Sequence, residues 1–326
     1  MNKIKTVILL GLLTALIVLI GRLIGGRAGM LIALVLAAAM NFFSYWYSDK
    51  IVLAMYRARP LDQASAGGVY QIVSELTQRA GLPMPRIFVI DDDTPNAFAT
   101  GRDPEHAVVA VTGGIMRILS PRELRGVLAH ELSHVKDRDI LISSVAATLA
   151  GAVMVLADMA RFGAIFGGLR GDDEDSGGGA LGVVGLVIMS ILAPLAAMLI
   201  QMAVSRSREF LADHEGGLMS SDPEALAGAL AKLEQANQAQ PMADARPQTA
   251  HMFIVNPLSG QSLAGLFSTH PPIPERIARL KELAAQTGAG PWRGPAPAPV
   301  GPGYAPPPPP PPAGSAPRGG GRIDWS

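Results

Sequence analysis

The chain has 326 residues, of which 49% are hydrophobic and 17% are charged, and its 27 basic residues balance 27 acidic ones. Charged residues are too few to cover a soluble domain of this size, which indicates that lipid covers part of the surface. The balanced charge provides no general field to attract nucleic acid, and the absence of cysteine excludes disulfides, cysteine nucleophiles and thiolate metal sites.

Four stretches are apolar and long enough to cross about 30 Å of hydrocarbon as helices. The first has no small-residue cleavage site after its apolar run, so we interpret it as a retained span and not as a cleaved signal peptide. The third contains four polar residues, and a re-entrant hairpin with the fourth is the alternative to two full spans. The stretches are Thr6–Ile24, Ala28–Tyr47, Ile140–Ala160 and Ala180–Val204.

Basic residues flank these stretches unevenly. With both termini inside, nine Lys and Arg residues lie on the inner flanks and four on the outer flanks, which favours this orientation. The acidic, Gly-rich segment 171–179 then forms an external loop. We therefore expect a multi-pass membrane protein whose polar regions face the cytoplasm.

Two polar regions follow the first and second pairs of spans. The first contains an amphipathic helix over Val69–Ala80 and two short β-branched strands, Arg86–Ile90 and Ala107–Thr112. The second is helical, with one helix starting at Asp222-Pro223. The predicted division is 1–49 (two transmembrane helices), 50–139 (first catalytic part), 140–204 (two further spans and the acidic loop), 205–286 (second catalytic part) and 287–326 (tail).

The tail is rich in Gly, Pro and Ala, and Pro306–Pro312 is an unbroken run of proline. Such a segment cannot bury a core, so we expect it to be disordered, with a stiff polyproline II stretch. A plain linker is one interpretation, and a ligand for a proline-binding partner is the other.

A capped helix begins near Ser120. Ser120 suits the N-cap, Pro121 the first helical position and Glu123 the third, which completes a capping box. Apolar residues then recur at helical spacing, and His130-Glu131-Leu132-Ser133-His134 stands among them.

The spacing of this motif predicts a metal site. Residues four apart lie within about 40° of one another around a helix, so the imidazoles of His130 and His134 can reach one ion. Glu131 lies beside that ion, where its carboxylate can take a proton from a water that the metal activates and pass it to the leaving amine. Zinc suits neutral imidazole ligands in tetrahedral geometry, and we expect one ion per chain.

A catalytic zinc site needs a third protein ligand. A membrane hairpin after the histidine helix returns the chain at Arg206–Asp213 to the same side of the membrane, which favours Glu209 as that ligand. Asp213, one turn later, can then accept the free N–H of a ligating histidine. The alternatives are a solvated charged collar, or His214 as the third ligand.

The motifs HELSH, SRSREFLAD and FSTHPPIPERIARL together resemble the HtpX family of bacterial membrane zinc endopeptidases, which are related to CAAX prenyl endopeptidases. The resemblance runs from the first span to about Leu283. It implies zinc on His130, His134 and Glu209, with Glu131 as the base. It also implies a mainly α, integral membrane fold, in which a small sheet of the gluzincin type accompanies the four hydrophobic helices.

Two further positions carry functional hypotheses. The segment Asn96, Ala97, Phe98 and Ala99 resembles the family's substrate-facing edge strand, and a turn capped by Asn96 is the alternative. His270 is a catalytic candidate that donates to the oxyanion, or else packs its loop. His106 and His251 are interpreted as bystanders.

The resemblance implies cleavage of damaged or misfolded membrane proteins, or of unfolded proteins, at the bacterial inner membrane, often under stress. The alternatives are a processing peptidase of narrow specificity and a non-enzymatic membrane scaffold with a structural metal. The lipid bilayer is an expected partner in each case, and nucleic acid is not.

Overall fold

The computed structural model describes residues 2–63, 67–150, 206–239, 249–255 and 271–288. The chain divides into two units, Met1–Trp292 and Arg293–Ser326, and every described residue belongs to the first. The end of the third apolar stretch, the fourth stretch, the acidic loop and the proline run lie outside the described residues.

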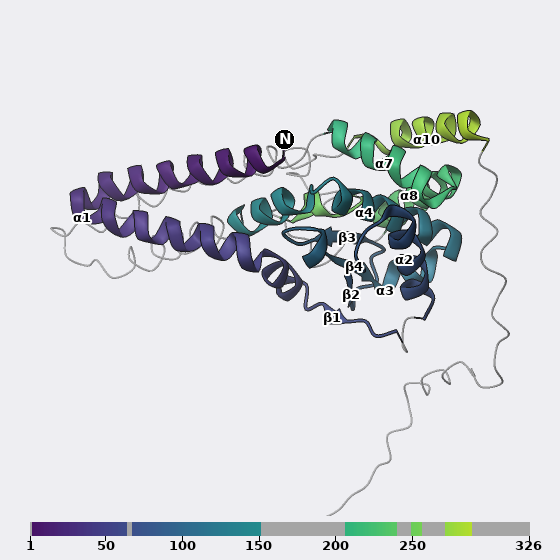
Figure 1. The fold of residues 1–326 in the computed structure, drawn as a ribbon, viewed down its shortest axis with the longest axis horizontal. Coiled ribbons are helices and arrows are strands. Elements are labelled where there is room, and N and C mark those ends of the chain that lie inside the picture. Colours follow the sequence, from purple (N-terminus) through teal and green to yellow (C-terminus); the bar gives the residue numbers. More distant parts are fainter. Residues whose placement is uncertain (1, 64–66, 151–205, 240–248, 256–270, 289–326) are drawn as a thin grey trace, which may run out of the picture. The chain divides into compact units, whose positions relative to one another are not determined.

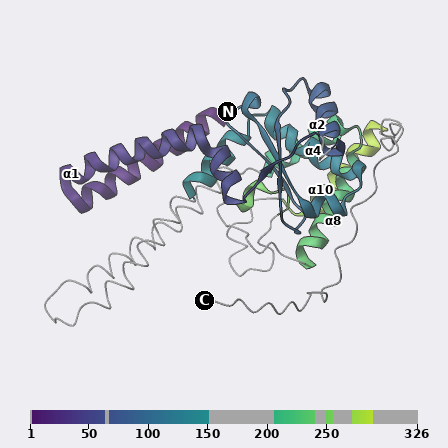
Figure 2. The same cartoon turned by 90° about the horizontal axis from the view of Figure 1, so that it is seen from below.

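The N-terminal helix α1 (Asn2–Met55) folds back on itself. Gly26, with a φ of 57°, lies at the reversal, and the Asn41 side chain donates to the Thr14 hydroxyl at 2.8 Å across the two arms. The arms approach so closely that a Cβ on Gly21 would lie 2.5 Å from a carbonyl oxygen of the facing arm. Figures 1 and 2 show the two purple arms side by side.

The predicted spans Thr6–Ile24 and Ala28–Tyr47 fall on the two arms of α1. Within the described residues, one helix, Gly26–Met55, is long and apolar enough to cross a membrane, and a shorter apolar helix covers Ile140–Ala150. The prediction of four full spans is therefore not confirmed.

A mixed sheet in the order β1-β2-β4-β3 lies within the first polar region. The central strands β2 and β4 are parallel, and the edge strands pair antiparallel to them. The two predicted strands are confirmed as β2 and β4. Their Val and Ile residues suit a sheet that is covered on both faces. The strands are β1 (Arg59–Pro60), β2 (Arg86–Ile90), β3 (Ala97–Thr100) and β4 (Val108–Thr112).

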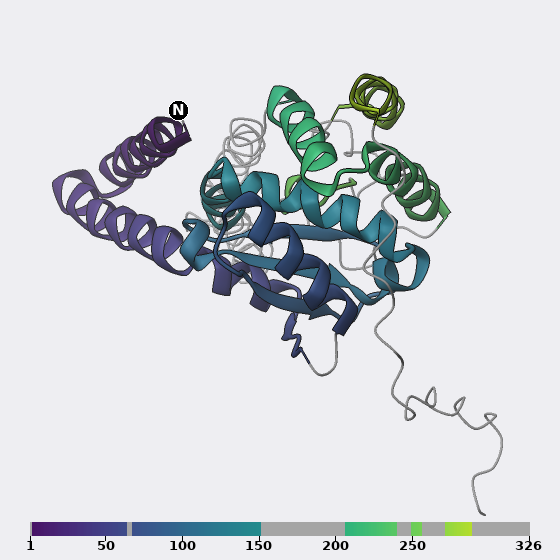
Figure 3. The same ribbon diagram turned by 45° about the vertical axis from the view of Figure 1, so that its right-hand side comes forward.

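Helices from both polar regions pack into one hydrophobic core with this sheet. Helix α4 contacts α2, α7, α8 and β3, and Figure 3 shows the green helices α7 and α8 lying over the teal α4. The amphipathic helix and the helix starting at Pro223 are confirmed. The helices are α2 (Gly67–Ala80), α3 (Gly113–Ile118), α4 (Pro121–Lys136), α7 (Arg206–Ser220), α8 (Pro223–Ala239) and α10 (Ile273–Thr287), with short turns η1 (Pro104–His106) and η2 (Ala250–Met252).

The start of α4 has the predicted capping box. The Ser120 hydroxyl accepts from the Glu123 backbone N–H, and the Glu123 carboxylate accepts from the Ser120 N–H at 2.9 Å. Leu124, Val127 and Leu128 of the apolar stripe are buried in the core. This packing fixes the rotation of α4, and with it the direction in which the histidines point.

A second, aromatic cluster joins the end of α1 to the sheet. The ring of Phe253 lies 5.2 Å from those of Tyr56, which follows α1, and Phe98 in β3. All three side chains are buried. Because such edge-to-face contacts add to the burial of large apolar surface, α1 is anchored to the strand that lies nearest the histidine helix.

Candidate metal centre

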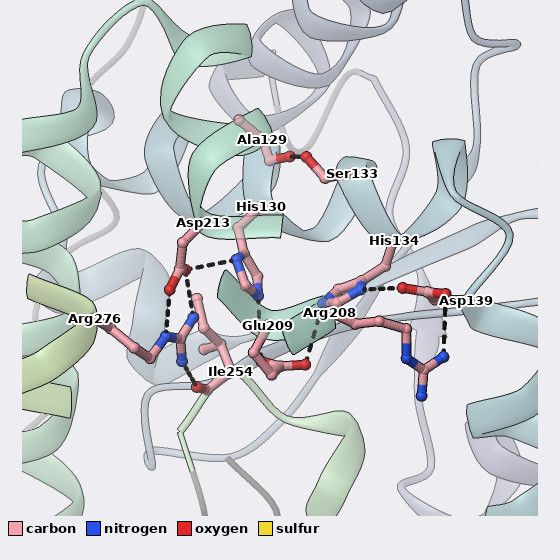
Figure 4. Close-up of polar contacts among 10 residues, drawn as sticks. All are labelled: Ala129, His130, Ser133, His134, Asp139, Arg208, Glu209, Asp213, Ile254 and Arg276. Atoms are coloured by element: carbon pink, nitrogen blue, oxygen red, sulfur yellow. Dashed lines mark hydrogen bonds and ion pairs between the residues drawn. The ribbon is translucent and has the colours of Figure 1, made fainter. Parts of the chain in front are cut away.

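Three side chains from two helices converge in one cluster, formed by His130 and His134 of α4 and Glu209 of α7. One donor atom of each lies within 4.8 Å of the others. His130 Nε2 is 3.9 Å and His134 Nε2 is 3.6 Å from a carboxylate oxygen of Glu209. Figure 4 shows both imidazoles pointing toward this carboxylate. We refer to the three residues as the ligand cluster.

Close packing of α7 on α4 brings Glu209 to the histidines. At Gly216 the helices approach so closely that an added Cβ would lie 2.8 Å from both N and Cα of His130. Real Cβ atoms do not approach backbone that closely, so only glycine permits this contact. The distance between the two helices therefore depends on a residue outside the cluster.

Asp213 and Arg276 hold the far side of His130. Asp213 Oδ1 lies 3.0 Å from His130 Nδ1, and Arg276 of α10 donates to both Asp213 oxygens at 2.7 Å. Burial works against ionisation of Asp213, but the charge and hydrogen bonds of Arg276 outweigh it and lower the pKa of Asp213 to about 2. The carboxylate therefore stays ionised and directs His130 Nε2 toward the cluster.

A second carboxylate and arginine lie next to the imidazole of His134 in a similar arrangement. Asp139 Oδ2 lies 3.4 Å from His134 Nδ1, and Arg208 donates to the other Asp139 oxygen at 3.1 Å. Burial alone would lower the pKa of His134, but the hydrogen bond to Asp139 and the charge of Glu209 raise it to about 9. Both histidines thus have a carboxylate behind the nitrogen that faces away from Glu209.

Glu131 lies beside the cluster and is 2% exposed. Its carboxylate accepts a hydrogen bond from the backbone N–H of Ala99 in β3. Burial raises the pKa of Glu131 to about 8, and the charge of Glu209 adds to the effect. A carboxyl group with such a pKa can both accept and release a proton near neutral pH.

These groups surround a cavity of about 30 Å³, which is enough space for a water-sized species. Apolar side chains, among them Ile140, Phe253 and Ile254, form part of its wall. His251 also lines the cavity, and its Nε2 lies 3.2 Å from the Ser143 carbonyl oxygen. The interpretation of His251 as a bystander concerns its role, which this position does not test, and the sequence around it contains no motif that indicates a place at the cavity.

The predicted substrate strand lies at the edge of the sheet, as β3, and all of its residues are buried. Ala99 lines the cavity. Ala97 already accepts a backbone hydrogen bond from Ile254 at 3.3 Å, and the Asn96 amide donates to the Val255 carbonyl at 3.0 Å. Phe98 packs in the aromatic cluster, so the substrate-binding role stays a prediction that depends on Ala99.

The remaining histidines lie elsewhere or outside the described residues. His214 lines a separate pocket between α7 and α10, away from the ligand cluster. His106 pairs with Asp103 at 2.5 Å in an exposed turn. His270 is not among the described residues, so its predicted role stays a prediction.

Sequence comparison identifies relatives over most of the chain. Residues 63–284 match the family model described as peptidase family M48. "Protease HtpX homolog" proteins are similar along nearly their whole length. The one from Syntrophobacter fumaroxidans is 64% identical over 283 residues, covering 86% of this chain and 99% of that protein. The one from Thermococcus kodakarensis is 55% identical, covering 87% of this chain and 97% of that protein.

Among solved structures, Ste24p from S. mikatae is similar with a TM-score of 0.49 and 19% identity, covering 86% of this chain and 65% of that protein.

The resemblance to the HtpX family that three motifs indicated is confirmed by these relatives. The family match spans the histidine helix, the returning helix α7 and most of α10. The chain is therefore a metalloprotease that belongs to peptidase family M48.

Proposed function

We propose that the chain is a zinc-dependent endopeptidase of the bacterial inner membrane, with its site facing the cytoplasm. One observation carries the proposal: two imidazoles of α4 and a carboxylate of α7 converge on one small cavity, with a second carboxylate, Glu131, beside them. The apolar helix Gly26–Met55 supports the membrane location. The proposed substrates are damaged or misfolded membrane proteins and unfolded proteins.

The donor set fits zinc. Two imidazole nitrogens and one carboxylate oxygen form a common set for catalytic zinc. Zinc bonds of about 2.0–2.2 Å place tetrahedral ligands about 3.3–3.6 Å apart, and the separations of 3.6 and 3.9 Å to Glu209 are close to this range. His130, His134 and Glu209 would hold one ion, while Asp213 and Asp139 would orient the two imidazoles.

The number of donors favours a catalytic over a structural site. Within the described ranges the cluster offers three donors, whereas structural zinc has four protein ligands. A zinc ion in such a site supplies a Lewis acid that polarises a carbonyl group and brings the pKa of water to about 7.

Glu131 is the proposed base. Its carboxyl group lines the same cavity as the cluster and is buried beside it. From this position it can take a proton from the attacking water and release it to the amine of the departing peptide. The backbone N–H of Ala99 holds the carboxylate in position and lowers the cost of its ionised form.

Ala99 also connects the base to the proposed substrate strand. An extended peptide beside β3 would pair with main-chain groups near Ala99, within reach of the cavity.

The test combines metal analysis with digestion of casein by the purified full-length chain. We expect about one zinc per chain, hydrolysis that chelation stops, and recovery on adding zinc. The Glu131→Gln variant should keep the metal and lose hydrolysis by a factor of about 10²–10⁴. Undiminished hydrolysis by this variant would exclude Glu131 as the base.

Substrate breadth is tested separately. Membrane proteins are digested with the wild-type chain, with the Glu131→Gln variant as control, and the products are sequenced. Scattered cleavage sites support a role in quality control. One repeated site in one protein would contradict it and support a processing peptidase.

A further inference from the structure

A second pocket lies where α1 meets the first polar region, and it shares no lining residue with the cavity of the ligand cluster. Its volume is about 580 Å³. Three separate segments form it: the end of the second arm of α1, the start of β2 and the turn around η1. We name it the interfacial pocket and define it by Trp46, Tyr47, Lys50, Arg86, Arg102 and Glu105.

The length of the apolar arm places this pocket at a membrane surface. Between Arg27 and Asp49 the chain contains no charged residue, and at 1.5 Å per residue this segment rises about 30 Å, the thickness of the hydrocarbon core. Large side chains along it, such as Val35 and Phe43, are 69% and 54% exposed. Trp46 therefore lies at the level of the lipid headgroups, where aromatic residues gather.

Two cations of the pocket lie over exposed aromatic rings. The Arg102 guanidinium is 4.7 Å from the centre of the Trp46 ring, and Lys50 Nζ is 5.1 Å from that of Tyr47. The rings hold the cations at the pocket. An aromatic wall next to cations suits a ligand with an apolar body and an anionic head.

Basic residues outnumber carboxylates in the lining of the pocket. Three cations and two carboxylates, Asp49 and Glu105, line it. Arg86 pairs with Asp49 at 2.6 Å and Arg102 with Asp103 at 3.4 Å, whereas Lys50 forms no ion pair within the part of the chain that the structure describes. A phosphodiester group carries one negative charge and accepts from Lys and Arg together, so it can pair with Lys50 beside the two arginines.

We propose that the interfacial pocket binds the phosphodiester headgroup of a membrane glycerophospholipid, whose acyl chains lie along the exposed arm of α1. The proposal rests on the proposed membrane location, but not on the metal or the catalytic residues. A bound lipid would contact α1, β2 and the η1 turn together, and so would fix the height of the catalytic region above the bilayer.

The test uses the fluorescence of Trp46. The chain has three tryptophans, so Trp292→Phe and Trp325→Phe leave Trp46 as the reporter. Full-length protein in detergent is freed of lipid and titrated with brominated phosphatidylglycerol, which quenches a nearby indole. We expect saturable quenching. Brominated diacylglycerol, which lacks the phosphodiester, should not saturate, and inorganic phosphate at equal concentration should not displace the lipid.

Variants distinguish lipid binding in the pocket from general electrostatic attraction between the protein and the lipid. Each basic residue near a membrane contributes about 1 kcal/mol, or roughly fivefold in affinity, so the pair Lys50→Gln and Arg102→Gln should weaken binding roughly 25-fold. The control pair Arg59→Gln and Arg117→Gln removes two exposed cations that do not line the pocket. The lipid affinity of this control should stay within about twofold of that of the chain that carries only Trp292→Phe and Trp325→Phe.

A variant that binds the lipid more tightly shows that the expected changes in affinity do not come from misfolding. Glu105→Gln removes a carboxylate from the pocket lining, so binding should tighten up to about fivefold. Equal affinity of the pocket pair and the control pair, weaker binding by Glu105→Gln, or saturable quenching by diacylglycerol would each overturn the proposal.

Flotation with vesicles and chelator-sensitive digestion of casein are measured on the same preparations. If the chain does not float, the proposed membrane location fails. If it floats and digests casein while the pocket pair binds lipid like the control pair, the lipid proposal alone fails.

Discussion

His130 in the ligand cluster is 1% exposed, whereas Trp46 in the interfacial pocket is 45% exposed. The first region buries polar groups, and the second exposes apolar ones. Buried groups of the first lie next to oppositely charged or polar partners, such as Asp213 behind His130. The comparison shows that protein contacts hold the cluster in place, while the apolar side chains along the second arm of α1 are exposed within the part of the chain that the structure describes.

The two regions should respond in opposite ways to substitution. A buried ion pair that loses one member leaves a charge without compensation, and this cost appears in any solvent. An exposed apolar helix tolerates polar residues in water, but not in a lipid bilayer. Substitutions in each region, with matched controls, therefore test the comparison directly.

The largest expected effect is the loss of metal from Glu209→Ala. Removal of residues that merely orient a ligand lowers metal affinity about 10–100-fold, and loss of a ligand should exceed this range. The control is His214→Ala, because His214 lies on the same helix but lines a different pocket. Metal analysis after dialysis distinguishes them, and metal loss by the His214 variant alone would reassign the third ligand.

Replacing Arg276 tests whether its ion pair with Asp213 supports the ligand cluster. Arg276→Gln leaves the buried Asp213 carboxylate without its cation, which should cost about 3–5 kcal/mol of stability and weaken metal binding about 10–100-fold. Arg279→Gln is the control on the same helix, since Arg279 is 54% exposed and pairs with Glu275, and it should cost less than about 1 kcal/mol. Thermal unfolding and zinc titration against a competing chelator measure both quantities.

A charged residue in the second arm of α1 tests whether lipid covers its exposed apolar side chains. Val35→Lys should oppose membrane insertion by about 3 kcal/mol, because the residue lies near the middle of the apolar stretch. Leu218→Lys in α7 is the matched control, being an exposed aliphatic residue as well, and should have an effect within about 0.5 kcal/mol. The measured quantity is the carbonate-resistant membrane fraction, and equal fractions would contradict a lipid-covered arm.

The smallest effect concerns the approach of α7 to α4. Gly216→Ala places a Cβ against the His130 backbone and should cost about 1–3 kcal/mol of stability. Gly228→Ala in α8 has its nearest neighbour at 3.5 Å and should stabilise the helix by up to about 1 kcal/mol. Melting temperatures that move in the same direction would argue against close helix packing at Gly216.

Local features were predictable because they depend on neighbours in the sequence. The capping box at Ser120 and the i, i+4 pair His130 and His134 follow from helical geometry alone. The strands β2 and β4 follow from β-branched runs bounded by turn residues. Arg276 was not predicted as a functional residue, because nothing in its own helix indicates that its side chain is buried against Asp213.

The sequence by itself determined the family motifs, the histidine pair and the apolar arms, since each lies within a short segment. Only the tertiary structure decided that Glu209 and not His214 faces the histidines, that Phe98 is buried and that His251 lines the cavity. These outcomes depend on how helices rotate and approach one another. That packing is set by contacts between residues far apart in the chain, such as Gly216 and His130.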